Sequence, residues 1–326
     1  MKILVTGASG FIGHHVVQAV VSQGLRAFPV LRAGSDRRDL EAHADRIRVV
    51  DLADAASCRE AVRGVDVVIH LAGLTRARSL QAFREVNVHG VSRLVTACHE
   101  AAPGLKRFVL VSSIAAAGPG VRSAPRRETD PCEPVTPYGV SKLEGEEALR
   151  AEAGSIPWTI VRPPVVYGPR ERDVLTLFKL CRRGVVPIVG WRDKHYSVVY
   201  GPDLARAIVE LALEPRASGR VFYVAERNVY SYMEFVGAIG RAMGRVPPRP
   251  RVPHLVPRII ALCGSLTQPF RRRPPLVSLS KLPEILAPGW VCATDAVREI
   301  LGDVAPTDLE RGARQTAAWY RESGWV

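Results

Sequence analysis

The first half of the chain alternates short apolar runs with amphipathic segments, and this alternation limits the possible folds more than any other feature. The apolar runs are rich in β-branched residues, as buried strands are, and the segments between them have the apolar spacing of helices. Expected strands cover residues 2–6, 26–31, 47–50, 65–71, 107–112 and 158–162, and expected helices cover 11–23, 58–63, 83–101 and 138–153. This order is typical of parallel βαβ units, which need helices on both faces of the sheet. The sequence therefore predicts an α/β fold with a doubly wound parallel sheet.

A glycine-rich loop joins the first expected strand to the first expected helix, in the segment Thr6-Gly-Ala-Ser-Gly-Phe-Ile-Gly13. Gly7 permits a tight turn, Gly10 lets the backbone approach a pyrophosphate, and Gly13 lets the helix pack closely on the strand. The helix N-terminus would present free amides to that anion. The loop thus indicates a dinucleotide cofactor, with a purely structural turn as the alternative. The residues expected to bind the cofactor here are Gly7, Ser9, Gly10, Phe11 and Ile12.

The regular alternation ends near Gly168, where prolines and glycines become frequent and strands become sparse. We therefore expect residues 1–165 to form a Rossmann domain that binds NAD(P), with roughly residues 194–215 returning to it. Residues 166–326 are expected to form a smaller, mainly helical lobe that binds the substrate. The last helix is expected near residues 307–323, where one face carries a stripe interpreted as packing.

The end of the second expected strand bears on the choice between NAD and NADP. An NAD-selective site usually has an acid here to bind the ribose 2′-hydroxyl, whereas this chain has Arg32, and Asp36 and Asp39 come too late. Arg32, assisted by Arg37 or Arg38, would instead bind a 2′-phosphate. The sequence favours NADP over NAD. The alternative is that Arg32 stacks on the adenine and that either cofactor is used.

Polar and small residues follow the next two strands. Asp51 and Leu52 are expected to meet the adenine, and Leu71, Ala72 and Gly73 are expected to line the path from the diphosphate to the nicotinamide. His70 is interpreted as structural. Asn87 is expected to bond the backbone and order the active site, unless it is simply solvated.

Tyr138 and Lys142 lie four residues apart on an expected helix, and Ser113 lies upstream at the end of the fifth strand. Residues at this spacing project from the same helix face. A lysine near a tyrosine stabilises the phenolate and lowers its pKa, so that the tyrosine acts as an acid or base near neutral pH. Together with the glycine-rich loop, the pair indicates a nicotinamide-dependent enzyme.

With these motifs the chain resembles the extended short-chain dehydrogenase/reductase family, also called the NAD-dependent epimerase/dehydratase family. The resemblance covers essentially the whole chain, and it implies that Ser113 bonds the substrate carbonyl, Tyr138 transfers the alcohol proton and Lys142 holds the nicotinamide ribose. It further implies that Ser112, Pro163 and Val165 face the cofactor. The remaining segments that carry it are 87–90, 111–118, 162–169 and 319–325.

Two departures from the family's nucleotide-sugar enzymes bear on the substrate. Those enzymes usually carry Arg-x-x-Asn after the sixth strand, but this chain has Arg162-Pro-Pro-Val165, and the segment Glu284–Trp290 lacks their C-terminal arginine. The 162–169 segment instead resembles the branch of 3β-hydroxysteroid dehydrogenases and dihydroflavonol reductases. An apolar pocket is expected from Val165, Val166, Tyr167, Leu175, Phe178, Val185, Val186, Ile188 and Val189, although each is as readily a core residue.

We therefore expect an NADP-dependent oxidoreductase, or one using NAD, that acts on a hydrophobic ketone or secondary alcohol. The alternative is a nucleotide-sugar epimerase with tightly held NAD. A dehydratase ranks lower because Ser113-Ile114-Ala115 offers no acidic pair. A non-catalytic protein that senses the cofactor is the third reading. The family resemblance suggests a homodimer formed through helices 83–101 and 138–153.

Composition bears on partners and location. The net charge of +13 comes from arginines spread along the chain, without a basic helix and interleaved aromatic residues, so we expect no nucleic-acid binding. Six scattered cysteines lack metal spacing, so we expect no metal. The chain opens on a strand, and no apolar run approaches the ~20 residues of a spanning helix, so we expect a cytoplasmic protein. Residues 255–266, followed by Arg271-Arg-Arg273, are interpreted as a buried helix with a solvated charge cluster; a lid or a membrane contact is the alternative.

Overall fold

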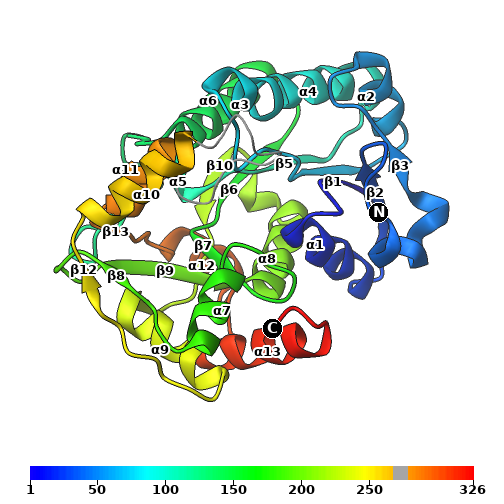
Figure 1. Ribbon diagram of the computed structural model, residues 1–326. Coiled ribbons are helices and arrows are strands. Elements are labelled where there is room, and N and C mark those ends of the chain that lie inside the picture. Colours follow the sequence, from blue (N-terminus) through cyan, green and yellow to red (C-terminus); the bar gives the residue numbers. More distant parts are fainter. Residues whose placement is uncertain (267–277) are drawn as a thin grey trace.

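The computed structural model describes residues 1–266 and 278–326, so the Arg271-Arg-Arg273 cluster lies outside the described residues. A seven-stranded parallel sheet forms the centre of the molecule (Figure 1), in the order β10-β6-β5-β4-β1-β2-β3. Its strands are β1 (Lys2–Thr6), β2 (Arg26–Leu31), β3 (Arg48–Val49), β4 (Val67–His70), β5 (Arg107–Val111), β6 (Trp158–Arg162) and β10 (Arg220–Tyr223).

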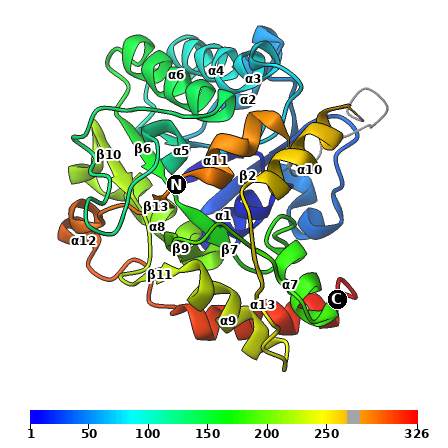
Figure 2. The same ribbon diagram turned by 60° about the vertical axis from the view of Figure 1, so that its left-hand side comes forward.

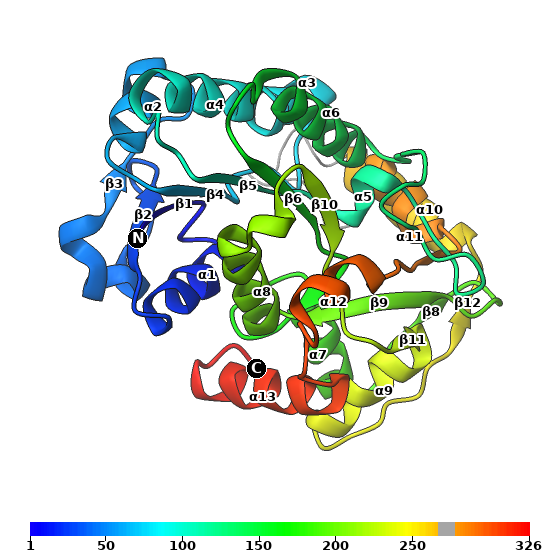
Figure 3. The same ribbon diagram turned by 180° about the vertical axis from the view of Figure 1, so that it is seen from behind.

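Helices cover both faces of this sheet, as Figures 1 and 3 show from opposite sides. On one face, α1 (Phe11–Ser22) and α8 (Gly201–Leu213) pack against the strands and each other around buried Val, Leu and Ile side chains. On the other face, α2 (Ala55–Val62), α4 (His89–Ala101) and α6 (Pro137–Glu152) bury a second apolar layer. The predicted doubly wound α/β fold is thus confirmed.

Two differences from the expected elements concern the central sheet. The helix expected over residues 83–101 is two helices, α3 (Leu80–Asn87) and α4, because the backbone of Val88 departs from helical geometry (φ −111°, ψ −65°). Because the apolar spacing continues across Val88, the sequence pattern did not reveal the break between α3 and α4. The seventh strand, β10, was not expected, since its four residues lie in the proline- and glycine-rich half and pair with β6 only through tertiary contact.

The second half of the chain adds two smaller sheets. One contains β7 (Val165–Tyr167), β9 (His195–Tyr200), β11 (Val229–Ser231) and β13 (Gly289–Trp290), and the other pairs β8 (Ile188–Val189) with β12 (Arg251–Val252). Around them lie α7 (Leu175–Arg183), α9 (Tyr232–Ala242), α10 (Leu255–Leu266), α11 (Leu282–Leu286), α12 (Asp295–Leu301) and α13 (Leu309–Glu322), while α5 (Ile114–Ala117) follows β5. Short 3₁₀ turns cover Arg38–Arg46, Pro215–Ala217 and Leu279–Lys281.

The stretch expected to return to the first domain divides between two sheets. Within it, α8 packs on α1 beside the central sheet, whereas β9 belongs to the four-stranded sheet. The domain boundary at residue 165 stays a prediction. The stripe on the last helix is buried as expected, and its members are Leu309, Ala313, Thr316, Ala317 and Tyr320.

The helix α10 differs from its expected role. Pro257 and Ala261 face the protein, but Leu255, Ile259 and Ile260 are exposed, so the prediction of an ordinary buried helix is wrong for most of its surface. Within the described part of the chain, no other segment covers these exposed apolar side chains. Within residues 1–266 and 278–326, no helix is long and apolar enough to cross a membrane.

A buried ion pair connects α6 to the central sheet. Glu146 on α6 accepts two hydrogen bonds from Arg162 at the end of β6, at 2.8 Å to Nε and 2.6 Å to Nη2. The side chains are 0% and 2% exposed, respectively. Arg162 also donates to the Tyr223 hydroxyl on β10 at 3.3 Å. One guanidinium therefore joins three elements away from water.

We predict that Glu146→Ala is strongly destabilising because it leaves the Arg162 charge buried and unpaired, a loss of about 3–5 kcal/mol in the free energy of unfolding. Chemical denaturation measures this change. The matched control is Glu100→Ala, which breaks the exposed pair with Arg59 and should cost less than about 1 kcal/mol. Equal losses in the two variants would contradict a central role for the buried pair.

Candidate active site

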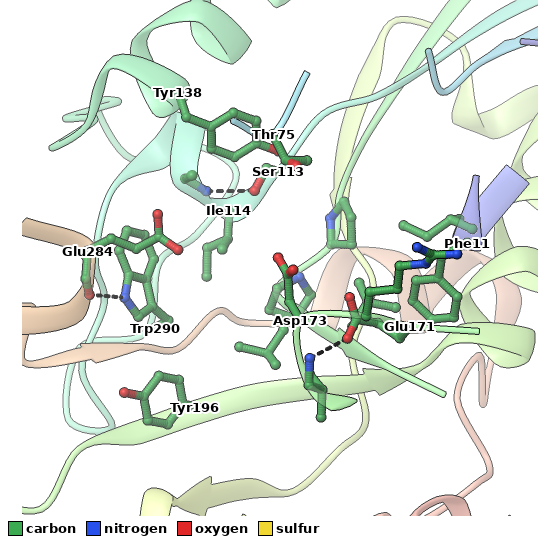
Figure 4. Close-up of a pocket in the computed structure, with 18 of the residues that line it drawn as sticks. Phe11, Thr75, Ser113, Ile114, Tyr138, Glu171, Asp173, Tyr196, Glu284 and Trp290 are labelled. Atoms are coloured by element: carbon green, nitrogen blue, oxygen red, sulfur yellow. Dashed lines mark hydrogen bonds between the residues drawn. The ribbon is translucent and has the colours of Figure 1, made fainter. Parts of the chain in front are cut away.

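A cavity of about 1010 Å³ opens at the carboxyl ends of the central strands, between the sheet and the second half of the chain. This is where doubly wound sheets bind their ligands. One wall comes from the loops after β1, β4 and β5, and the opposite wall carries Tyr196, Glu284 and Trp290 (Figure 4). The predicted residues that line it are Gly7, Ser9, Gly10, Phe11, Ile12, Leu71, Gly73, Ser112, Ser113, Tyr138, Lys142, Pro163 and Val165.

The glycine-rich loop approaches its neighbours so closely that side chains are excluded. Gly7 has φ +69°, and a Cβ there would lie 2.9 Å from the Ala72 nitrogen; a Cβ on Gly13 would lie 2.1 Å from the Gly7 oxygen. The first turn of α1 contains no acid, and its N-cap, Gly10, makes no side-chain cap bond. The open amides and the bare backbone fit the pyrophosphate of a dinucleotide.

Thr6 holds the ends of β1 and β4 together. Its Oγ1 accepts hydrogen bonds from the amides of Leu71 and Ala72, both at 3.1 Å, and lies 2.8 Å from His70 Nδ1. Because the hydroxyl accepts twice, its own proton is directed to Nδ1. Burial lowers the pKa of His70 to about 3, with the positive charge of Lys142 as a smaller cause. A neutral, enclosed His70 fits the structural role that the sequence suggested.

Asn87 fastens the loop after β4 to α6. Its Oδ1 accepts from the Leu74 amide at 2.8 Å, and its Nδ2 donates to the Leu74 carbonyl at 3.0 Å and to Ser141 Oγ at 2.9 Å. The backbone bonding predicted for Asn87 is present. Asn87 and Ala72 support the cavity from behind and do not line it.

The three predicted catalytic side chains meet at one point of the cavity wall. Tyr138 and Lys142 project from α6, whose N-terminus is fixed by Thr136 Oγ1 accepting from the Gly139 amide at 3.1 Å. Ser113 caps α5 by accepting from the Ala115 amide at 3.1 Å, and its hydroxyl lies near the Tyr138 side chain. Figure 4 shows the Tyr138 ring directed at Ser113.

The pKa of Tyr138 differs from the expectation. Although the ring keeps some solvent contact through the cavity, burial of the side chain raises the pKa of Tyr138 to about 12. The nearby Ser113 hydroxyl lowers this pKa, and the charge of Glu284 raises it further. The predicted lowering is therefore not found. The ammonium group of Lys142 donates to the Val111 carbonyl at 2.8 Å, and burial lowers the pKa of Lys142 to about 8, opposed by the Glu146 charge.

The residues predicted around the adenine lie outside this cavity. Arg32 is exposed and has no side-chain partner among the described residues, whereas Arg38 is paired with Asp36 at 2.6 Å. Asp51 is exposed and caps its own turn, accepting from the Ala53 amide at 2.9 Å, and Leu52 is half-buried beside it. Among the described residues that follow β2, Arg32 and Arg37 therefore both have guanidinium groups without a side-chain partner.

The predicted apolar pocket divides into lining and core. Val165, Val166, Ile188 and Val189 line the cavity. Tyr167, Phe178 and Val186 instead belong to a buried cluster, with Leu175 packed against it, and Val185 is exposed. The sequence pattern did not distinguish the lining residues from the core residues, because both kinds are neighbours within the same short elements.

Several polar lining residues were not predicted. Glu171, Arg172 and Asp173 follow β7, directly after the 162–169 motif, and Asp173 is ion-paired with Arg76. Glu284 comes from α11, with its Oε2 buried and unpartnered, and its backbone carbonyl accepts from Trp290 Nε1 at 3.1 Å. The sequence pattern could not predict a role for Glu284, because α11 lies far from Tyr138 in the sequence and only the tertiary structure brings it near. No group of His, Cys, Asp or Glu in the described residues is arranged to hold a metal ion.

The depressed pKa of Lys142 predicts a pH dependence of stability. With a folded-state pKa of about 8 against 10.5 ordinarily, the unfolded chain binds this proton more tightly. Between these pH values the free energy of unfolding should rise with pH. Chemical denaturation at pH 8 and at about pH 10 should show a smaller rise for Lys142→Met than for the wild type. Lys106→Met, at an exposed lysine, is the control, and an unchanged rise in Lys142→Met would refute the prediction.

Comparisons with known proteins identify the family of the chain. Residues 3–225 match the model of the NAD dependent epimerase/dehydratase family. The chain is 30% identical to a ceramide reductase of Caulobacter vibrioides, covering 99% of this chain and 96% of that protein, and 27% identical to a 2-alkyl-3-oxoalkanoate reductase of Stenotrophomonas maltophilia, covering 98% and 99%. The fold matches a solved UDP-glucose 4-epimerase of Thermotoga maritima with a TM-score of 0.79 at 22% identity, over 99% of both chains. The chain belongs to the NAD-dependent epimerase/dehydratase family of extended short-chain dehydrogenases/reductases.

Proposed function

We propose that the protein is an NADP-dependent reductase of a ketone carried by a hydrophobic, lipid-like substrate. The observation that carries the proposal is the convergence of Ser113, Tyr138 and Lys142 on a cavity whose other wall is largely apolar and aromatic. Two relatives are named as reductases of ceramide and of 2-alkyl-3-oxoalkanoates. The second name specifies a keto group on an alkyl chain.

The residues divide the chemical work between them. The nicotinamide, when bound, supplies the hydride. Ser113 would donate a hydrogen bond to the carbonyl oxygen, on which negative charge develops as the hydride arrives. Tyr138 would donate the proton that converts this oxygen into a hydroxyl group. Lys142, which carries its charge below about pH 8, would stabilise the phenolate left behind and bind the nicotinamide ribose.

The protonated form of Tyr138 is the one that reduction of a ketone requires. A phenol with a pKa of about 12 is protonated at neutral pH and is therefore ready to act as an acid. Oxidation of an alcohol would need the phenolate, which burial and the Glu284 charge disfavour. In the resting enzyme, the favoured form is the one that reduces ketones.

Glu284 adds a polar requirement to the part of the cavity near Tyr138. Its unpartnered Oε2 faces the cavity near Tyr138, and a buried carboxylate oxygen without a donor is unfavourable. A substrate with a hydroxyl or amide donor close to the ketone would satisfy it. A long-chain compound with a polar group beside the reacting carbon fits the cavity better than a plain hydrocarbon ketone.

A nucleotide-sugar epimerase with tightly held NAD is the second candidate, because the UDP-glucose 4-epimerase of Vibrio cholerae is 26% identical over 99% of this chain. Val165 argues against it, since a valine at the cavity wall cannot hydrogen-bond a diphosphate. Thermal unfolding with NADP and added UDP separates the two: a clear shift with UDP would support the epimerase and overturn the reductase.

We predict that the wild type oxidises NADPH in the presence of a detergent-dispersed long-chain 3-oxo compound, and that Tyr138→Phe lowers turnover about 100-fold or more by removing the proton donor. Cofactor affinity, measured by NADPH fluorescence, should change little. Tyr196→Phe is the matched control, because it removes a hydroxyl from the far wall of the same cavity and should retain most activity. Near-normal turnover of Tyr138→Phe would rule out the proposed acid.

We also predict that Arg32 selects NADP. Arg32→Ser should raise the Kd for NADPH about tenfold or more, because a charge-assisted bond to the 2′-phosphate is lost, and should leave the Kd for NADH almost unchanged. Arg38→Ser is the control, since Arg38 is already paired with Asp36. Tighter binding of NADH than of NADPH by the wild type would contradict this prediction.

A further inference from the structure

The helix α10 presents its apolar residues to solvent. Leu255, Ile259, Ile260 and Leu262 are 62%, 52%, 52% and 51% exposed, while Pro257 and Ala261 face the protein. The helix lies on the outside of the molecule beside α11 (Figure 2). A surface helix normally directs its apolar stripe at the core, so this reversed orientation indicates a partner that is itself apolar.

Aromatic and basic side chains adjoin this face. Trp191 is 70% exposed and lines the same surface cavity as Pro253 and His254, the two residues before α10. Arg192, next to Trp191, and Arg258, on α10, are exposed and have no ion-pair partner among the described residues. The sequence from residue 235 to 283 contains no Asp or Glu. In the loop of residues 190–194, called here the Trp191 loop, the one acid is Asp193, which is paired with Arg251 at 2.6 Å.

A second cavity lies at this surface, next to the active-site cavity. It has a volume of about 1000 Å³ and is lined on its outer side by Trp191 and His254. Arg192, Asp193 and Lys194 line both this cavity and the catalytic one. The two cavities therefore lie next to each other at these three residues.

We propose that α10 and the Trp191 loop dock the protein on an anionic lipid bilayer, from which a substrate chain passes through the second cavity into the active site. Exposed isoleucine and leucine side chains would enter the interface, and Trp191 would lie at the headgroup level. Arg192 and Arg258 would contact anionic headgroups. The inference extends the proposed function, and it replaces the expectation from the sequence that membrane contact is improbable.

Charge favours the bilayer over a second copy of the chain. In a two-fold interface the same patch lies on both sides, so Arg192 and Arg258 of two copies would be brought close to one another. Because residues 235–283 contain no Asp or Glu, that stretch offers no carboxylate to pair with these arginines. An anionic surface supplies that compensation, whereas a symmetric dimer through this face lacks it.

Co-sedimentation with phosphatidylcholine–phosphatidylglycerol vesicles, without cofactor or substrate, tests the docking. The wild type should bind, and should bind pure phosphatidylcholine much more weakly. The double variant Ile259→Glu, Ile260→Glu should lose about tenfold or more in vesicle affinity, and Arg258→Gln about fivefold. The matched control, Val21→Glu with Val49→Glu, changes two exposed apolar residues elsewhere and should bind like the wild type.

Circular dichroism verifies that the variants fold, and light scattering records their mass. Absent vesicle binding by the wild type would overturn the proposal, as would equal losses in the α10 and control variants. A dimer that only the α10 variant dissociates would assign the face to a second copy and overturn it too. Because no turnover is measured, failure here leaves the reductase proposal intact, and a catalytic failure leaves the docking result intact.

Discussion

The buried ion pair between Glu146 and Arg162 is the interaction on which the rest of the site depends. Glu146 lies one helical turn beyond Lys142 on α6, so the position of this carboxylate determines how α6 sits against the sheet. Arg162 ends β6 and also bonds Tyr223 at the end of β10. Two charges removed from water tolerate little displacement, because separation leaves each one unpaired in a low dielectric. The pair thereby holds Tyr138 in register with Ser113, and the charge of Glu146 helps to keep Lys142 protonated.

The two halves of the cavity are built in different ways. The cofactor half is made of backbone: the bare turn at Gly7, the open amides of α1 and the strand ends fastened by Thr6 leave room for a phosphate where side chains do not fit. The substrate half is made of side chains from β9 and from the neighbouring elements α11 and β13, which lie far from β9 in the sequence. Local backbone geometry therefore forms the cofactor half of the cavity, which the family shares. Long-range packing forms the substrate half, in which the members of the family differ.

Strand and helix periodicity predicted the central sheet well, because each βα unit buries one continuous apolar face and so leaves a regular pattern. The pattern failed where burial did not decide the outcome. The break at Val88 keeps apolar spacing on both sides, so 83–101 appeared to be one helix. The apolar run of 255–266 looked like a core helix, although its isoleucines face outward. In both places the apolar residues predicted a helix, but they did not show where the first helix breaks or which side of the second one is buried.

The sequence by itself determined the doubly wound fold, the dinucleotide loop and the shared helix face of Tyr138 and Lys142, because all three depend on local spacing along strands and helices. The role of Ser113 was predicted from the family resemblance. Tertiary structure alone decided the protonation preference of Tyr138, the approach of Glu284 and the position of a second cavity beside the first. The physical reason is desolvation. How strongly a phenol or a carboxylate is removed from water depends on every element that packs around it, and spacing along the chain does not record those neighbours.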